Sequence, residues 1–352
     1  MHLYQREKKN GFLIAGLFLS GLVGAGFGSG REIYVYFASF GPVGLVGFLC
    51  SCAALWGGSV WILEIVIGHH FTDMGQISKF VAKGKMAPFY TGVMLLFSFA
   101  GYVAMISGIR DVLAPVFPTV ARGFPVLFGS CTGGIVVAFS LLALYSNFAA
   151  YSRVCAVVTP GIIFCVAAVA VFGAFYTPSQ PLSLQGDLAH IGQLILKSIF
   201  YIGYNLLFLL GILGRAGTLS ASVREIRQGS LWGAGLFFIC GACIFLALCV
   251  IRPEIAQKEL PLPAVIGTLG LLPERIFCCV LALAMLLCSA CNLGAMGSVL
   301  GKKSFVVPLF ALSGIPLSYI GFNSVVSVVY PVFGVVGILF LLALAQMRRK
   351  IV

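Results

Sequence analysis

An apolar segment near the start of the chain is interrupted by the stretch Gly24-Ala25-Gly26-Phe27-Gly28-Ser29-Gly30-Arg31-Glu32. Four glycines fall within seven residues, and each glycine costs about 1 kcal/mol relative to alanine inside a helix. The charged pair Arg31-Glu32 follows directly. The pattern predicts a break in an apolar helix. Close helix packing is the alternative, because Gly24 with Gly28 and Gly26 with Gly30 both fit a G-x-x-x-G spacing.

The composition around this stretch is that of a membrane protein. Of the 352 residues, 60% are hydrophobic and only 9% are charged, against about 25% charged in an ordinary soluble protein. The mean hydropathy of +1.08 also excludes intrinsic disorder. A net charge of +12 does not indicate nucleic-acid binding, because the basic residues lie in separate short loops.

Apolar runs long enough to cross a bilayer predict ten membrane helices. With the N-terminus inside, fifteen of the 22 Lys and Arg residues lie on the cytoplasmic side and six outside, which favours a multi-pass protein of the plasma or inner membrane with both termini cytoplasmic. We expect one transporter domain over residues 1–352. The predicted spans are 11–39, 42–68, 88–114, 124–145, 154–176, 190–213, 230–251, 273–298, 304–321 and 324–346.

Five spans lie in residues 11–176 and five in residues 190–346. An odd number of spans makes the second half enter the membrane from the opposite side. Any structural repeat between the halves is therefore expected to be inverted.

A break at residues 24–28 frees backbone amides that must find partners in protein, water or ligand. Half-helix N-termini carry N–H donors and a positive dipole end, so they can hold a substrate carboxylate without a buried Arg or Lys. The stretch is not a dinucleotide-binding motif, because Ser29 stands where that motif needs glycine and no strand precedes it.

Other polar residues within apolar runs are candidates for the same site. Asn205, beside Tyr204, is costly at membrane depth unless paired, and either a ligand or a neighbouring helix can be its partner. Glu64 can hold the backbone amides of the broken helix in place, or it can take up and release a proton, and we favour the structural role. The hydroxyl of Tyr102 can reach a ligand, although a buried tyrosine more often bonds within the protein.

The run 273–298 carries Met285, Cys288, Ser289 and Asn292 on one helical face. A hydroxyl beside freed carbonyls can contribute to a cation site, whereas a lone serine more often bonds its own helix. The four His residues do not cluster with carboxylates in the sequence, so a metal or a catalytic triad is not expected.

These residues resemble the YkvI-like amino-acid permease family, a branch of the amino acid, polyamine and organocation (APC) superfamily with the LeuT fold. The resemblance covers all ten predicted spans. The stretch Gly24–Glu32 is similar to the family motif G-A-G-F-x-S-G-R-E, and Tyr204-Asn205 and Glu64–Gly68 give weaker support.

The resemblance implies an all-α membrane protein with a five-plus-five inverted repeat and with helices 1 and 6 unwound around one site. In such a transporter Arg31 and Glu32 form part of the external gate, or they pair with each other at the membrane interface. Carried over residue by residue, the substrate site is Gly24, Ala25, Gly26, Gly203, Tyr204 and Asn205, and Tyr102 is added from the sequence itself.

The sodium site of coupled relatives maps to residues of helices 1 and 8. Cys288 replaces one of the two adjacent hydroxyl residues of the sodium pattern, and a thiol is a poor Na⁺ ligand, so proton coupling or exchange stays open. The mapped residues are Ser20, Val23, Met285, Cys288 and Ser289.

We therefore expect a secondary active transporter of a small carboxylate-bearing solute, with an amino acid as the leading candidate, working by alternating access with Na⁺ or H⁺ coupling. No other cofactor and no nucleic-acid partner are expected; the partners are the solute and the lipid bilayer, and the oligomeric state stays open. The alternatives are an exchanger or proton-coupled carrier of another small carboxylate, and, from another class, an intramembrane enzyme or a membrane assembly scaffold.

Overall fold

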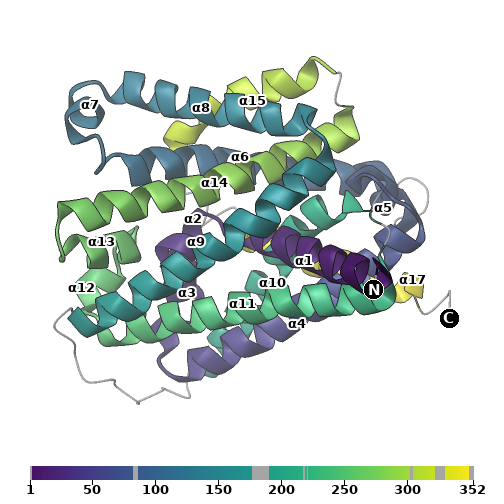
Figure 1. The fold of residues 1–352 in the computed structure, drawn as a ribbon, viewed down its shortest axis with the longest axis horizontal. Helices are drawn as coiled ribbons and strands as arrows, with labels where there is room; N and C mark the ends of the chain where they lie inside the picture. Colours follow the sequence, from purple (N-terminus) through teal and green to yellow (C-terminus); the bar gives the residue numbers. More distant parts are fainter. Residues whose placement is uncertain are drawn as a thin grey trace.

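The structure, a computed structural model, describes residues 2–81, 86–176, 190–216, 219, 221–301, 304–321 and 330–348. Every regular element in these ranges is a helix, and the long helices run alongside one another in a single bundle (Figure 1).

The longer elements follow the predicted apolar runs. In the first half they are α1 (His2–Leu22), α2 (Ala25–Ser29), α3 (Arg31–Tyr36), α4 (Val43–Gly68), α6 (Ala87–Leu113), α8 (Pro125–Tyr145) and α9 (Phe148–Tyr176). In the second half they are α10 (Ile191–Leu213), α11 (Val223–Val250), α14 (Leu271–Leu300), α15 (Val306–Leu317) and α17 (Tyr330–Arg348). Short connecting helices are η1 (Ala38–Phe40), α5 (Met74–Val81), α7 (Pro118–Gly123), α12 (Pro253–Ala256), α13 (Pro261–Gly267) and η5 (Ser318–Ile320).

Seven of the described helices are long and apolar enough to cross a membrane, and the apolar helices over Asn10–Leu22, Val306–Ile320 and Tyr330–Ala343 are shorter. Together they coincide with the ten predicted runs, but ten crossings and the inverted repeat of 11–176 on 190–346 stay predictions. Residues 177–189, which join the two predicted halves, lie outside the described residues.

Among the seven long apolar helices, three are the most buried. Buried residues make up 72% of the apolar stretch of α14, 67% of that of α6 and 61% of that of α10, against 39% in each of α4, α8 and α9. Helix α1 packs against α9, α10 and α11, and α14 packs along α6. The interrupted segment α1–α3 is therefore surrounded by other helices.

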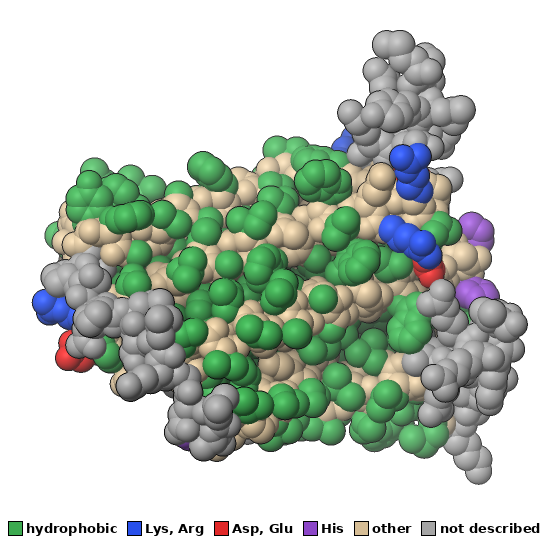
Figure 2. All heavy atoms as spheres, turned by 90° about the horizontal axis from the view of Figure 1, so that it is seen from below, with side chains coloured by type: hydrophobic (Ala, Val, Ile, Leu, Met, Phe, Trp, Pro, Cys, Tyr) green, Lys and Arg blue, Asp and Glu red, His purple; other side chains and the backbone are tan. Residues whose placement is uncertain are grey.

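Hydrophobic side chains cover the middle of the face in Figure 2, whereas its Lys, Arg, Asp, Glu and His side chains lie toward the two ends. Such a surface fits a bilayer, because apolar side chains meet lipid and charges meet water. Helix α1 begins and α17 ends at the same end of the bundle (Figure 1), as expected for an even number of crossings.

The predicted break in helix 6 is wrong. Helix α10 is continuous from Ile191 to Leu213 and carries a single mid-helix glycine, Gly203. A side chain at Gly203 would collide with the backbone of Gly334 in α17. This glycine therefore permits close packing of α10 on α17 and leaves the helical hydrogen bonds of α10 intact.

Candidate functional site

The first apolar helix is interrupted where the glycine pattern predicts. Helix α1 ends at Leu22, Gly24 adopts an extended conformation with φ −110° and ψ −162°, and α2 begins at Ala25. Gly24 has no side chain to cap the first N–H groups of α2. The N–H of Gly24 donates to the carbonyl of Leu22 at 3.0 Å, and that of Gly28 donates to the carbonyl of Gly24 at 3.0 Å. The break is therefore present as expected, whereas two of the five amides expected to be free are bonded within the chain.

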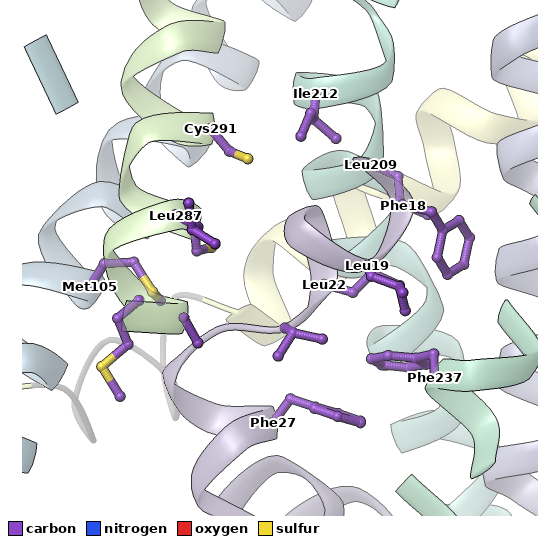
Figure 3. Close-up of a cluster of buried hydrophobic side chains, with 14 of the residues drawn as sticks. Phe18, Leu19, Leu22, Phe27, Met105, Leu209, Ile212, Phe237, Leu287 and Cys291 are labelled. Carbon is purple, nitrogen blue, oxygen red and sulfur yellow. The ribbon is translucent and has the colours of Figure 1, made fainter. Parts of the chain in front are cut away.

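The walls of the break come from α6, α11 and α14. A Cβ at Gly24 would lie 3.3 Å from Cε of Met105 and 3.6 Å from Sγ of Cys288. Beyond the break, Phe27 stacks on Phe237 of α11 with ring centroids 4.2 Å apart. Figure 3 shows Met105 beside the turning chain and Phe27 facing Phe237. Apolar groups thus surround the interrupted backbone.

A second change of direction follows at Gly30, whose φ of +85° lies in the left-handed region that glycine adopts most readily. Helix α3 starts directly after it, so Arg31 and Glu32 diverge. Arg31 Nη1 donates to the carbonyl oxygens of Gln257 at 2.9 Å and Lys258 at 3.5 Å. Arg31 and Glu32 do not form the interface pair that the sequence left open.

Glu32 instead turns into the bundle, where it is 5% exposed. Its carboxyl group occupies the place that a Cβ would take at Gly26, so only glycine lets the carboxyl lie against the break. Oε2 of Glu32 accepts a hydrogen bond from Oη of Tyr204 at 3.1 Å. The predicted gate residue Glu32 and the predicted substrate residue Tyr204 therefore belong to one cluster.

Four buried tyrosines, including the donor Tyr204, pack against one another beside this carboxyl group, and we call them the tyrosine cluster: Tyr36, Tyr201, Tyr204 and Tyr330. The ring of Tyr36 lies 5.4 Å from that of Tyr201 and 5.7 Å from that of Tyr204. Tyr204 lies 5.4 Å from Tyr201 and 4.7 Å from Tyr330, measured between ring centroids. The cluster joins α3, α10 and α17.

Basic side chains near these helices bond elsewhere. Nζ of Lys197 in α10 donates to the carbonyl of Val35 at 2.8 Å, and Arg31 binds the backbone of the α12 region. Among the residues that the structure describes, no Lys, Arg or His forms an ion pair with Glu32. The cluster is therefore a buried acidic group among aromatic rings.

Three further predicted substrate residues, Tyr102, Asn205 and Gly203, pack within the bundle. The ring of Tyr102 packs against Gly314 of α15, and its hydroxyl lies near Ser140 of α8 without a well-formed hydrogen bond. Nδ2 of Asn205 donates to the carbonyl of Tyr201 at 2.9 Å within its own helix. At Gly203 a Cβ would meet the backbone of Gly334 in α17, and its role as a substrate contact stays a prediction.

The predicted cation-site hydroxyls are each satisfied by a different neighbour. Oγ of Ser20 donates to the carbonyl of Leu17 at 3.1 Å and lies 3.8 Å from Sγ of Cys291. Oγ of Ser289 donates to the carbonyl of Leu286 at 2.8 Å and lies 3.0 Å from Oγ of Ser140 in α8.

Val23, Met285 and Cys288 are buried, and Cys288 faces Gly24. Ser20 and Ser289 belong to separate hydrogen-bond networks, since each donates to a carbonyl of its own helix. A lone serine in an apolar helix commonly bonds in this way.

Glu64 lies apart from the break. Its Oε1 is 3.6 Å from Nη2 of Arg227, and this pair links α4 to α11 beside a groove of about 520 Å³ that also contains Trp56 and Trp61. This contact does not involve the break, so the support of the broken backbone by Glu64 stays a prediction. All twelve cysteines are free thiols.

Sequence reasoning missed three members of the tyrosine cluster as site residues. Tyr36 follows Glu32 by four positions and Tyr201 precedes Tyr204 by three, so each pair shares a helical face and the spacing was a usable signal. Tyr330 comes from α17, and no sequence signal links it to Glu32.

Comparisons with known proteins agree with this architecture. No family model matches the chain. Over 365 aligned residues the chain is 22% identical to the uncharacterized membrane protein YkvI of Bacillus subtilis (strain 168), and the alignment covers 99% of this chain and 100% of YkvI. The crystal structure of MhsT in complex with L-phenylalanine superposes with a TM-score of 0.62 at 15% identity, covering 90% of this chain and 79% of MhsT.

The chain has the LeuT fold. It resembles YkvI along its whole length, so the sequence-based assignment to a YkvI-like protein of this fold is confirmed. Together with the long apolar helices, the likeness to a membrane protein supports a multi-pass membrane protein.

Proposed function

We propose that this protein is a secondary active transporter of a small carboxylate-bearing solute, with an amino acid as the leading candidate. The observation that carries the proposal is the interrupted helix at Gly24, which lies among the inner helices and has the buried carboxyl of Glu32 folded against Gly26. A break of this kind is where transporters of this architecture hold anionic substrate groups. The MhsT structure, which shares the fold, contains L-phenylalanine.

In the proposed transport cycle, ten helices in two inverted five-helix halves alternate between two openings around the break. The N–H groups near Gly24, Ala25 and Gly26 receive the substrate carboxylate. The protein lies in the plasma membrane with both termini cytoplasmic, and it belongs to the APC superfamily. The positive charge bias of the loops supports this orientation.

Coupling to H⁺, or exchange, is the second candidate within transport, and a specific observation favours it over Na⁺. Cys288 stands where a hydroxyl is usual, and the hydroxyls of Ser20 and Ser289 bond other neighbours. A thiol is a soft ligand that suits Na⁺ poorly. A carrier of a small carboxylate other than an amino acid fits the same features.

The enzyme and scaffold alternatives have less support. Among the described residues no group of three His, Cys, Asp or Glu side chains could hold a metal ion. A scaffold has no need of a broken helix with a buried carboxyl group. The transporter fold therefore remains the best account of the break.

The test is a binding screen followed by transport. The detergent-purified protein is heated with each common amino acid, in Na⁺ or K⁺ and at two pH values, because a ligand that binds the folded state raises its apparent stability. Hits are then measured as uptake into proteoliposomes. We expect at least one amino acid to bind and to be transported, and Gly24→Leu to abolish both while the protein still folds. Unaltered uptake by that variant would disprove the site.

A further inference from the structure

Glu32 is buried with one donor among the described residues, the hydroxyl of Tyr204. A carboxylate offers about four acceptor positions on its two oxygens, so most of its hydrogen-bonding capacity is unused. Burying such a group is costly unless it is paired. A membrane protein that keeps it at this depth has a functional use for it by default.

The surroundings of Glu32 are suited to a cation. Tyr36, Tyr201 and Tyr204 are 3% exposed or less, and their rings present electron-rich faces that attract ammonium groups. Tyr330 completes the cluster, with its ring 4.7 Å from that of Tyr204. Arg31 and Lys197 bond backbone carbonyls, so neither competes for the carboxyl group.

We propose that Glu32, hydrogen-bonded to Tyr204 of the tyrosine cluster, is the subsite for the ammonium group of the transported solute. The inference rests on the proposed function and adds a substrate class, because the solute must carry an organic amine. A hard inorganic cation fits less well, since Na⁺ prefers a shell of several oxygen ligands and the cluster supplies mainly aromatic faces.

The packing indicates how the ammonium group gains access. Ring centroids in the tyrosine cluster lie 4.7 to 5.7 Å apart, so a ligand reaches the carboxyl only when the rings separate. The Tyr204 hydroxyl is the donor that the ammonium replaces. Glycine at position 26 keeps the carboxyl beside the break, where the proposed carboxylate contact lies. One amino acid then bridges both groups.

The experiment compares ligands that lack one group each. The full-length protein in detergent is titrated with L-phenylalanine, 2-phenylethylamine and 3-phenylpropionate, and with L-alanine, ethylamine and propionate, following thermal stabilisation. For the wild type we expect an amino acid and its amine to bind and the matching acid to bind at least tenfold more weakly. Glu32→Gln should weaken binding of the amino acid and amine at least tenfold, while the matched exposed variant Glu254→Gln leaves both unchanged.

Two further variants keep the test decisive if Glu32→Gln does not fold. Glu32→Asp retains the charge and should retain amine binding within about tenfold, whereas Tyr330→Leu removes one aromatic face of the tyrosine cluster and should weaken amine binding. Amine binding unchanged in Glu32→Gln, or unchanged in Tyr330→Leu and lost in Glu32→Asp, would overturn the inference. So would stabilisation by NaCl over KCl without any amine.

The two proposals fail in distinguishable ways. If amino acids bind and are transported equally by wild type and Glu32→Gln, the ammonium subsite is wrong and the transport proposal stands. If no amino acid, amine or acid stabilises or enters proteoliposomes with the wild type, both proposals are overturned.

Discussion

The hydroxyl of Tyr204 in α10 donates a hydrogen bond to the carboxyl of Glu32 in α3, across 172 positions of sequence and at 3.1 Å. This bond connects the interrupted first helix to an unbroken helix of the second half. It is also the one polar side-chain contact of Glu32 among the described residues.

Removing the donor should destabilise the protein. Tyr204→Phe leaves a buried carboxyl oxygen without its partner, which costs about 1 to 3 kcal/mol. We expect a lower midpoint of thermal unfolding in detergent. Tyr319→Phe is the control, because the Tyr319 hydroxyl donates to the carbonyl of Val126 in an exposed position. Equal midpoints for the two variants would show that the bond to Glu32 contributes nothing.

The contact between Gly26 and Glu32 should be visible as coupling between two substitutions. Gly26→Ala places a methyl group where the carboxyl lies, so we expect loss of stability and of ligand binding. Gly26→Ala combined with Glu32→Ala should cost less than the sum of the single changes, by about 0.5 to 3 kcal/mol.

The matched control for the glycine substitution is Gly235→Ala in α11, because a Cβ there meets nothing within 4 Å. This variant should be neutral or more stable by up to about 1 kcal/mol, since alanine favours helix. Additive effects at positions 26 and 32 would contradict the contact.

Sodium should have little effect on this protein. Because Ser20 and Ser289 bond different neighbours, we expect equal binding and uptake in Na⁺ and K⁺ for the wild type. Cys288→Ser should not create a sodium requirement, because it leaves the Ser289 hydroxyl bonded toward α8. The measurement is initial uptake rate into proteoliposomes in the two salts. A tenfold stimulation of wild-type uptake by Na⁺ would refute this prediction and revive the sodium site.

The ion pair between Glu64 and Arg227 should contribute little. The Arg227 side chain is 62% exposed and that of Glu64 is 20% exposed, and such pairs contribute about 1 kcal/mol or less. Glu64→Gln should therefore shift the unfolding midpoint only slightly and leave uptake intact. Abolished uptake in a folded Glu64→Gln protein would indicate a proton-carrying role instead of structural support.

The helical segments could be predicted from hydrophobicity because a bilayer demands long apolar runs. The break at Gly24 could be predicted because alternate glycines are poor helix formers. The predicted break in α10 was wrong, because a single glycine such as Gly203 can permit close packing as well as unwinding. Which of the two occurs depends on the position of Gly334 in α17, and the sequence does not show that position.

The direction of Glu32 could not be predicted from sequence. It follows from the positive φ of Gly30, which reorients α3 so that Arg31 meets an outer loop and Glu32 the bundle. A backbone dihedral has no periodic signature in the chain. The contact of Tyr330 with Tyr204 could not be predicted either, because it depends on how α17 packs on α10.

Arg31 donates hydrogen bonds to the carbonyl oxygens of Gln257 and Lys258, so α3 is bonded to the connection between α11 and α14. A displacement of α3 is then transmitted through these hydrogen bonds to the exposed segment that contains Gln257 and Lys258. A fluorophore or spin label attached near Lys258 becomes a remote reporter of events at the buried carboxyl group, readable without touching the binding residues.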